Sequence, residues 1–597
     1  MEEQQQPLDS LIEQRKAKLA ALRARGIDPF KNKFTPSESC TTARANYEEG
    51  RAVAVAGRIT AHRDMGKSMF IDVRDQSGRI QVYAQKNVLG DEQFDIFRHL
   101  DLGDFIGAQG ALFTTKTGEI SVKLTSFIIL AKALRPPPAK YYGLEDTEIR
   151  YRQRYLDLIA NPEVKNLFLM RSDIIREIRS FLHDRGFVEV ETPMMQAIPG
   201  GAAAQPFKTR HNALGCDFYL RIALELYLKR LLVGGLDKVF EIGRNFRNEG
   251  LSRKHNPEFT MLEAYQAYGD YESMMELVQG MVCHVAENVL DTLVIEHNQD
   301  EAVKTAIHLA LKDLDDVSTS MTGNLLKATD GDTAAGFVKA AGTARSALAA
   351  ALQQIGAVPC CEIAKAAVGA ILVAIGNLGL HKAKLSGGNK PLEDSLASAA
   401  ARFDAVVRTL EKLSTPKIIN LTPPWHRVKY KDLVREVAGN DWFDVTPAER
   451  RQRAHDLGAE IAKDYQDFEV TGAVFEKLIE PTLIQPTFVT HVPKELVPLA
   501  KLSPEDPTTV EVFECCINGQ EIAPAYTEQN DPIEQRERLE HQAGGEQQKL
   551  DEDFLVALEH GMPPAGGMGL GIDRLCMMLL GQESIRDVIL FPQMKPK

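Results

Sequence analysis

The sequence lacks the usual signs of a secreted, zinc-binding or membrane-spanning protein. Its eight cysteines include no Cys-x-x-Cys motif, and the adjacent pairs Cys360-Cys361 and Cys515-Cys516 suit neither a zinc site nor ordinary disulfides. The polar stretch from Met1 to Pro7 is unlike a secretory signal. The longest apolar run, about Ala366 to Leu380, is shorter than the ~20 residues that cross a bilayer. We therefore expect reduced thiols, no membrane segment and a cytoplasmic location.

An excess of positive charge is also missing. The chain holds 70 Lys and Arg residues against 83 Asp and Glu residues, which gives a formal net charge of -13. The overall charge therefore does not indicate nucleic-acid binding, although a local basic strip can contact phosphates on an acidic protein. At 597 residues, the chain is long enough for several domains and a large buried core.

Changes in composition along the chain predict six segments. Residues 52–133 contain short alternating runs separated by turn signals, which favour a small Greek-key barrel of the oligonucleotide-binding kind. Residues 300–415 have less charge, more alanine and repeated helical spacing of apolar residues. The predicted segments are an N-terminal helical extension (1–51), the barrel (52–133), a proline-stiffened linker (134–150), a first mixed α and β segment (151–299), an inserted helical domain (300–415) and a second mixed segment (416–597).

One stretch of the first mixed segment predicts a β-hairpin with a long loop. Val239 to Phe246 and Glu258 to Tyr265 alternate as strands do, and the residues between them include the Gly, Ser, Asn and Pro of a loop. Counting by two places Phe259, Met261, Glu263 and Tyr265 on one face of the return strand. A carboxylate and a phenol that share a face with an aromatic ring suit a ligand site better than a core.

The loop of this hairpin can bring charged side chains to the same face. Arg247, Glu249, Arg253 and His255 are the donors and acceptors that a nucleoside triphosphate would need, and arginine binds phosphate oxygens in pairs. For Arg247 and Glu249 taken singly, a solvated ion pair at the hairpin tip is the more ordinary interpretation.

A second hairpin is predicted by Asn518-Gly519 between two alternating runs. A two-residue turn there places Cys516 opposite Glu521 and makes Glu514 a diagonal neighbour of Glu521, typically at ~7 to 8 Å. Two carboxylates at that spacing can share a magnesium ion that carries phosphates. An exposed acidic pair without a cation would be mildly unfavourable, which is itself a reason to expect one.

Glu528 follows on the same strand. Strict alternation from Glu521 would turn Glu528 to the opposite face, so a bulge or the end of the strand must intervene before it. Pro524, which cannot donate a ladder hydrogen bond, is the candidate for that break. The placement of Glu528 does not follow from the residues alone.

Three stretches resemble the signature motifs of class II aminoacyl-tRNA synthetases. Phe-Arg-Asn-Glu (246–249), Arg-x-His-Asn-Pro-Glu-Phe-Thr (253–260) and Glu-Ala-Tyr (263–265) resemble the second motif in the form typical of the lysyl enzymes. Residues 185–193 resemble the first motif, a helix and strand that form the dimer interface. Residues 566–575 resemble the glycine-rich third motif, with Arg574 in the first turn of a helix.

The resemblance implies an α+β fold. It consists of the class II antiparallel sheet flanked by helices, an N-terminal OB-fold barrel and an inserted α-helical domain, where the family has a much shorter connection. The barrel, with Gly57-Arg58-Ile59 and Phe70-Ile71-Asp72, is similar to the anticodon-binding domain of the lysyl, aspartyl and asparaginyl enzymes. There Phe70 would stack on a base, while Arg58 and Gln81 would read base edges; for Phe70, a place in the barrel core is the ordinary alternative.

The reaction implied by the resemblance is the ATP-dependent attachment of L-lysine to tRNA(Lys) through a lysyl-adenylate. Arg247 and Arg574 would be the catalytic residues, and Glu514 and Glu521 would bind Mg2+. The positions that match the ATP site are Arg247, Glu249, His255, Phe259, Glu514, Gly571 and Arg574. The positions that match the lysine site are Gly201, Glu225, Glu263, Tyr265, Tyr526 and Glu528. A second copy of the chain would bind through Gly186 to Pro193.

Three residues depart from the lysyl pattern near the amino-acid pocket: Pro524 replaces Asn, Leu224 replaces Pro, and Gln205 replaces Arg. An aspartyl or asparaginyl synthetase is therefore the close alternative, but it would want a cation in place of Glu225 and Glu528. A paralogue that lysylates a protein would lack the barrel, and a non-catalytic RNA-binding protein would not need the arginines. The insert has no catalytic or metal-ligand spacing, and its role stays unassigned.

Overall fold

The computed structural model describes residues 2–138, 144, 146–202, 204–297, 300–324, 331–355, 357–384, 390–543 and 550–596. The chain divides into two compact units, Met1–Lys165 and Asn166–Lys597. The boundary between the units falls after the predicted linker (134–150), because two short helices, the first of which begins within that linker at Thr147, belong to the N-terminal unit.

The N-terminal unit is built on a closed five-stranded barrel in the order β1-β2-β3-β5-β4, which confirms the predicted OB-fold. Its strands are β1 (Ala52–Asp64), β2 (Ser68–Arg74), β3 (Arg79–Gln85), β4 (Phe105–Thr114) and β5 (Ile120–Ala131). Alternate residues of β1, among them Val53, Val55 and Ile59, are buried inside the barrel. The helices of this unit are α1 (Glu2–Ala24), α2 (Cys40–Ala45), α3 (Lys86–Arg98), α4 (Thr147–Arg152) and α5 (Arg154–Ala160).

The C-terminal unit is organised around an eight-stranded sheet in the order β14-β15-β16-β17-β18-β11-β10-β6. Its central strands are antiparallel, whereas β6 and β14 pair in parallel with their neighbours at the two edges. The strands are β6 (Val188–Glu189), β10 (Lys238–Phe246), β11 (Glu258–Ala267), β14 (His426–Lys429), β15 (Thr487–Thr490), β16 (Val512–Ile517), β17 (Gln520–Thr527) and β18 (Ala565–Gly571). A separate sheet holds β7 (Met195–Gln196), β8 (Lys208–His211) and β9 (Cys216–Leu220). This arrangement confirms the predicted α+β class.

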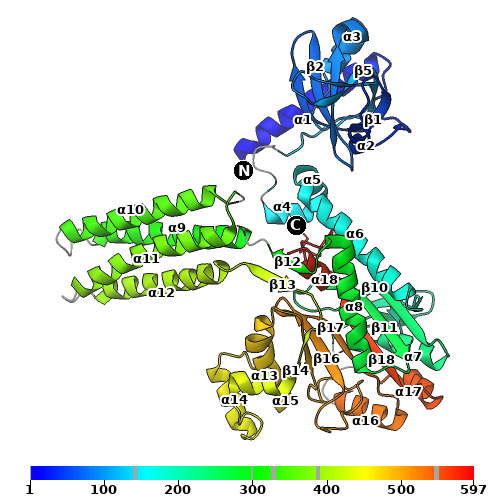
Figure 1. Ribbon diagram of the computed structural model, residues 1–597, viewed down its shortest axis with the longest axis vertical. Coiled ribbons are helices and arrows are strands. Elements are labelled where there is room, and N and C mark those ends of the chain that lie inside the picture. The colour runs from blue at the N-terminus through cyan, green and yellow to red at the C-terminus, as the bar shows by residue number, and fades with distance from the viewer. Residues whose placement is uncertain are drawn as a thin grey trace. The chain divides into compact units, whose positions relative to one another are not determined.

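Helices cover this sheet, and α8 lies along one face of it (Figure 1). Helix α8 begins after Asp270, whose carboxylate accepts the Ser273 N–H in a capping box. The helices of the unit outside the insert are α6 (Pro162–His183), α7 (Glu225–Val233), α8 (Tyr271–Leu290), α13 (Tyr430–Ala438), α14 (Pro447–Asp456), α15 (Asp467–Val474), α16 (Pro532–Ala543), α17 (Glu552–Glu559) and α18 (Ile572–Leu579), with short turns η2 (Phe475–Ile479) and η3 (Glu480–Thr482).

The two faces of β11 differ in the way that its alternation predicts. Leu262 and Ala264 are fully buried in the main core, which also contains Met274 and Val278 of α8. The alternate residues, Phe259, Met261, Glu263 and Tyr265, therefore point to the other face of the sheet. Packing of α8 on one face leaves the opposite face of the central strands for polar side chains.

The β16–β17 hairpin turns at Asn518 and Gly519, both with positive φ, as a two-residue loop of this kind requires. Cys516 pairs with Glu521 as predicted, but the register then shifts, so that Cys515 pairs with Ala523. The extra residue is Ile522.

This bulge turns Pro524, Tyr526 and Glu528 to the face of Glu521. A bulge was expected, and the structure places it at Ile522 instead of Pro524, because the strand gains its extra residue directly after the turn. Glu514 consequently pairs with Pro524 on the same face as Glu521.

The insert is a bundle of four helices that lie side by side (Figure 1). They are α9 (Asp300–Asn324), α10 (Gly331–Gln353), α11 (Cys360–Lys384) and α12 (Lys390–Leu413). The bundle has a hydrophobic core of its own, in which Ile307, Leu348, Ile371 and Phe403 are fully buried. Its two ends meet in a small antiparallel sheet of β12 (Val294–His297) and β13 (Lys417–Asn420). In the part of the chain that the structure describes, no helix is both long and apolar enough to cross a membrane.

The paired ends predict that the insert can be removed without unfolding the rest. His297 and Lys417 lie opposite each other in the β12–β13 ladder, so an Asn-Gly turn can join them in place of residues 298–416. We expect this shortened chain to unfold cooperatively, with a Tm within about 5 °C of the full chain by calorimetry.

A longer deletion that also removes β12 and β13 is the control. It takes Ile295 and Ile419 out of the main core and should lower the Tm of the remaining unit. Loss of cooperative unfolding in the shorter deletion would contradict an autonomous insert.

Candidate active site

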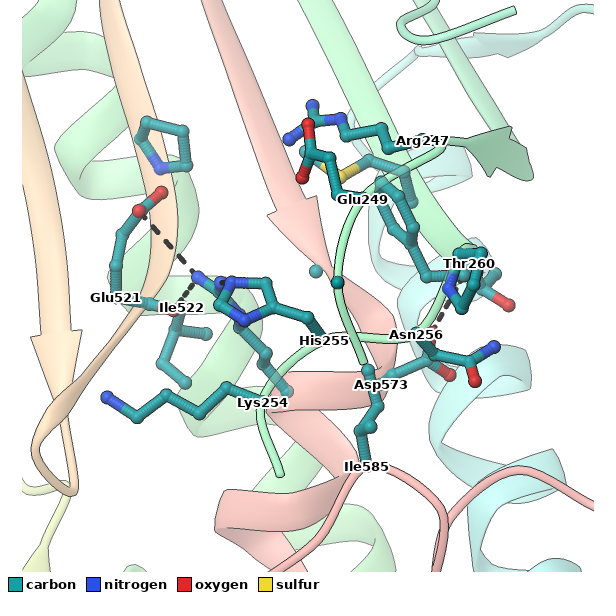
Figure 2. A pocket seen from close by; sticks show the side chains of 17 residues that line it. Arg247, Glu249, Lys254, His255, Asn256, Thr260, Glu521, Ile522, Asp573 and Ile585 are labelled. Carbon is teal, nitrogen blue, oxygen red and sulfur yellow. Dashed lines mark hydrogen bonds and ion pairs between the residues drawn. The ribbon is translucent and has the colours of Figure 1, made fainter. Parts of the chain in front are cut away.

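A cavity of about 280 Å³ lies between the β10–β11 loop, β17 and the start of α18. Figure 2 shows Arg247 and Glu249 on one side of this cavity and Glu521 on the other, with His255 between them. Six of the residues predicted to contact ATP line it: Arg247, Glu249, His255, Phe259, Gly571 and Arg574. The loop and the glycine-rich strand, which are far apart in the sequence, therefore meet at one site.

Two arginines lie at this cavity. The guanidinium carbon of Arg247 lies 5.2 Å from the centre of the Phe259 ring. Burial lowers the pKa of Arg247 from its ordinary value, yet that value is so high that the side chain stays charged. Arg574 donates to the Glu521 carbonyl at 2.9 Å and to His255 Nε2 at 3.4 Å. The cation beside the Phe259 ring is thus Arg247.

The β10–β11 loop adds an imidazole and an ammonium group to the cavity, from His255 and Lys254. Burial, and then Arg574, lower the pKa of His255, so its ring is neutral near pH 7. Its Nδ1 pairs with the Ser252 hydroxyl at 2.8 Å, which fixes the ring. Lys254 donates to Glu480 at 3.3 Å and also lines the cavity. The loop thus presents positive charge and donors suited to phosphate oxygens.

Glu521 is the carboxylate on the opposite wall, whereas Glu514, the seventh residue predicted to contact ATP, does not line the cavity but interacts with Glu521. Burial, and then the carboxylates of Glu521, Glu480 and Glu476, raises the pKa of Glu514 to about 8. Oxygen ligands that repel one another in this way fit a hard divalent cation such as Mg2+. Among the described residues, no group of three or more His, Cys, Asp or Glu side chains is arranged to hold a metal. Mg2+ on Glu514 and Glu521 would therefore need phosphate oxygens and water to complete its coordination.

A second charged group is buried where α7 meets the end of β17. Lys229 Nζ lies 2.6 Å from Glu225 Oε1 and also forms an ion pair with Glu528. The Tyr526 hydroxyl donates to Glu225 Oε2 at 2.7 Å. Glu225, Lys229 and Glu528 are at most 5% exposed. The structure thus brings together Glu225, Tyr526 and Glu528, as predicted, and adds a lysine between them.

Glu263 and Tyr265 of β11 join this group. The Leu224 N–H donates to Glu263 Oε1 and the Tyr265 hydroxyl donates to Oε2, both at 3.1 Å. Burial, and then the Glu225 carboxylate, raises the pKa of Glu263 to about 7. Glu263 is therefore poised near neutral pH, and a cation beside it would favour its charged form.

Two glycines make room for these side chains. A Cβ on Gly567 would lie 2.0 Å from Glu528 Oε1 and 2.5 Å from the Tyr265 ring. Gly201 has a φ of +87°, and a Cβ there would lie 3.4 Å from the Cβ of Glu225. The Gly201 backbone consequently lies beside the acidic pocket, where it was predicted.

The three departures from the lysyl pattern have different structural consequences. Leu224 supplies the N–H that bonds Glu263, which proline could not donate. Pro524 lines the cavity that contains Arg247 and Arg574. The Gln205 side chain is exposed, and its carbonyl accepts the Asn248 N–H at 2.7 Å.

The predicted anticodon residues lie on the barrel in different settings. Phe70 is partly exposed and stacks on Tyr83 with ring centres 4.6 Å apart, and Phe113 lies 5.6 Å beyond Tyr83. Arg58 lies over the Phe105 ring at 4.4 Å. Gln81 is buried and accepts a hydrogen bond from Ser121 at 3.0 Å. The row of rings, more than Gln81, has the form of a base-stacking surface.

Sequence reasoning assigned no role to Lys229, Lys254, Glu480 or Asp573. The spacing of Lys229, four residues after Glu225 on a helix, is a signal for an ion pair on one face. Asp573 accepts the Thr260 N–H at 2.7 Å and pairs with Arg171, and no spacing in the sequence points to those partners. Glu480 accepts the Glu521 N–H at 3.1 Å.

Gly567 and Gly571 on β18 give a matched test of this packing. We expect Gly567→Ala to lower the free energy of unfolding by about 1 to 3 kcal/mol, because the added methyl overlaps Glu528 and Tyr265. Gly571→Ala meets only Arg574 at 3.6 Å, an ordinary contact, and should have a much smaller effect. Urea unfolding of both variants measures the difference; equal losses would show that Gly567 is not sterically required.

Comparison with known proteins agrees with this geometry. Residues 146–595 match the family model "tRNA synthetases class II (D, K and N)", and residues 53–130 match "OB-fold nucleic acid binding domain". A lysine--tRNA ligase of Carboxydothermus hydrogenoformans is 42% identical over 99% of both chains. One of Pelotomaculum thermopropionicum is 41% identical over 99% of this chain and 96% of its own, and one of Bacillus subtilis is 40% identical over 100% and 99%. With the glutamates, arginines and barrel in the positions described, the chain belongs to the class II tRNA synthetases and, within them, to the lysine--tRNA ligase family.

Proposed function

We propose that this protein attaches L-lysine to tRNA(Lys) in two steps, through a lysyl-adenylate. The observation that carries the proposal is the acidic pocket, in which the carboxylates of Glu225 and Glu528 pair with buried Lys229 and the buried carboxylate of Glu263 lies near Glu225. Oε1 of Glu528 is buried and has no hydrogen-bond partner among the described residues. A buried carboxylate oxygen without a partner is costly, so the pocket favours a substrate that brings an ammonium group.

The first step needs positioning and charge neutralisation more than a base. A carboxylate is already ionised near neutral pH and is the nucleophile toward the α-phosphorus of ATP. Arg247, between the acidic pocket and the loop, would hold the substrate carboxylate and the α-phosphate, while Arg574 and His255 would hold the departing pyrophosphate. Phe259 would stack on adenine.

Glu514 and Glu521 would hold Mg2+, which when bound supplies positive charge against the phosphates of ATP. The pKa of Glu514, raised by burial and neighbouring carboxylates, supports a cation at this position. In the second step, the terminal ribose hydroxyl of tRNA would attack the adenylate carbonyl and release AMP.

The N-terminal barrel would bind the anticodon of the same tRNA. Phe70, Tyr83 and Phe113 form a partly exposed row of rings suited to stacking on unpaired bases. Arg58 and Gln81 stay candidates for reading base edges. The barrel also distinguishes this chain from a paralogue that lysylates a protein. A protein with this function would act in the cytoplasm.

We infer a homodimer that forms through the helix and strand around Gly186 to Pro193. Val188 is 50% exposed and Phe591 is 67% exposed. A cavity of about 470 Å³ lies next to Phe591 and is lined by Phe168 and Ile175 of α6. An exposed ring beside a hollow of this size, and the exposed Val188 within the Gly186 to Pro193 segment, favour a protein partner, and a second copy would bury them.

An aspartyl or asparaginyl substrate is the alternative. Lys229 is the kind of cation that such a pocket would need, but Glu225 and Glu528 already neutralise it. The remaining negative charge of the pocket repels a substrate carboxylate. The acidic pocket therefore supports lysine.

ATP–pyrophosphate exchange with each amino acid separately tests this function. We expect exchange with lysine and none with aspartate or asparagine. Glu528→Gln should lower kcat/KM for lysine at least about 100-fold, because it removes a buried ionic partner. Asp531→Asn changes an exposed carboxylate three residues away and is the control. Exchange with aspartate or asparagine but not with lysine would overturn the proposal.

The pKa of Glu263 predicts a pH effect on lysine binding. Because burial and Glu225 raise this pKa to about 7, Glu263 takes up a proton as the pH falls and loses its attraction for the substrate α-ammonium. We expect KM for lysine to rise about tenfold from pH 8 to pH 6, while KM for ATP changes little. Glu263→Gln should bind lysine weakly at every pH. A wild-type KM that stays flat over this range would contradict the role given to Glu263.

A further inference from the structure

Lys229 is the buried charge that the proposed mechanism does not use. It lies on α7, one turn after Glu225, and its side chain is 0% exposed. Its ammonium pairs with Glu225 on the same helix and with Glu528, which follows β17. Burial alone would lower the pKa of Lys229, but these two carboxylates raise it above the ordinary value. The side chain is therefore a charged link between two elements that are distant in the sequence.

The carboxylate oxygens of the two glutamates have different partners. Lys229 Nζ forms ion pairs with Oε1 of Glu225 and Oε2 of Glu528, and the Tyr526 hydroxyl donates a hydrogen bond to Oε2 of Glu225. Oε1 of Glu528 is left without a hydrogen-bond partner among the described residues. Without Lys229, the two buried carboxylates would repel each other and separate or share a proton.

The net charge of the pocket matches the two ammonium groups of a lysine substrate only when Lys229 is counted. Glu225, Glu263 and Glu528 carry three negative charges when ionised, and Lys229 cancels one of them. Two charges remain, the same number as the α- and ε-ammonium groups of lysine. Arg247 is not part of this balance, because it is expected to pair with the substrate carboxylate.

We propose that Lys229 is a positioning residue that sets lysine specificity: its ammonium holds Glu225 and Glu528 in place and leaves the pocket two negative charges for a diamino acid. This rests on the proposed function and adds a residue to it. The Lys229 ammonium does not touch the reacting atoms. It acts through the two glutamates that receive the substrate.

The test compares Lys229→Met, which keeps the length of the side chain but not its charge, with Lys229→Arg, which keeps the charge. In ATP–pyrophosphate exchange, Lys229→Met should raise KM for lysine at least about 30-fold, with KM for ATP and kcat at saturating lysine within about threefold of the wild type. Lys229→Arg should recover most of the loss. The preference for lysine over methionine, a neutral amino acid of similar length, should fall in the Met variant.

A pH profile separates positioning from mere destabilisation. In Lys229→Met, raising the pH from about 7 to about 9 should lower KM for lysine again, because the shared proton is lost. The wild type should change little above pH 8. The titratable groups shown against Lys229 are Glu225 of α7, Glu528 after β17 and Tyr526 of β17. Glu263 and Tyr265 of β11 interact in turn with Glu528 and Glu225.

Lys132 offers a matched control in the barrel. It is also a buried lysine that bridges two carboxylates, Asp101 and Asp104. Lys132→Met should lower the Tm but leave KM for lysine unchanged. If Lys229→Met does not fold, Lys229→Gln, which keeps a hydrogen-bonding group but not the charge, replaces it in the assay.

Each outcome bears on one claim. A KM for lysine in Lys229→Met within about threefold of the wild type, or equal increases for lysine and ATP with no recovery at high pH, overturns the positioning role. For Lys229→Gln, retention of the wild-type preference for lysine over methionine does the same. A wild type that shows no lysine-dependent exchange overturns the proposed function itself, before any variant is compared.

Discussion

The ion pairs that join Glu225, Lys229 and Glu528 are the constraint on which the amino-acid pocket depends. Each of these charges is buried, and removing one partner would leave the others uncompensated at a cost of about 3 to 5 kcal/mol. The helix α7 and the end of β17 must therefore keep one relative position. Two backbone features allow Glu528 to reach Lys229. The bulge at Ile522 turns Glu528 to the face of Glu521, and Gly567 leaves space for the Glu528 carboxylate.

Much of the fold follows from local patterns. The alternation in the first hairpin predicted which face of β11 carries Phe259 and Glu263, and the structure agrees because α8 buries Leu262 on the other face. Asn518-Gly519 predicted the second turn, since both residues adopt positive φ with little strain. These features were predictable because a few neighbouring residues determine them.

Features that depend on distant partners were not predictable from the residues alone. The position of the bulge at Ile522 is set by the pairing of β17 with β16 and β18, which no short motif encodes. Lys229 has the right spacing from Glu225, but its second partner, Glu528, lies on another element. The burial of Gln81 against Ser121 likewise depends on the closure of β3 and β5 into a barrel.

Two of the three departures from the lysyl pattern, Leu224 and Pro524, can be understood by comparing the energy of a single hydrogen bond with that of a buried charge. Leu224 adds an N–H donor to Glu263 where proline has none, whereas Pro524 removes an amide on the neighbouring strand β17. The two changes act in opposite directions on donors around the pocket, and neither alters its charge. Because a hydrogen bond contributes about 1 kcal/mol net and a buried unpaired charge costs several, the three glutamates and Lys229 outweigh both changes in selecting the substrate.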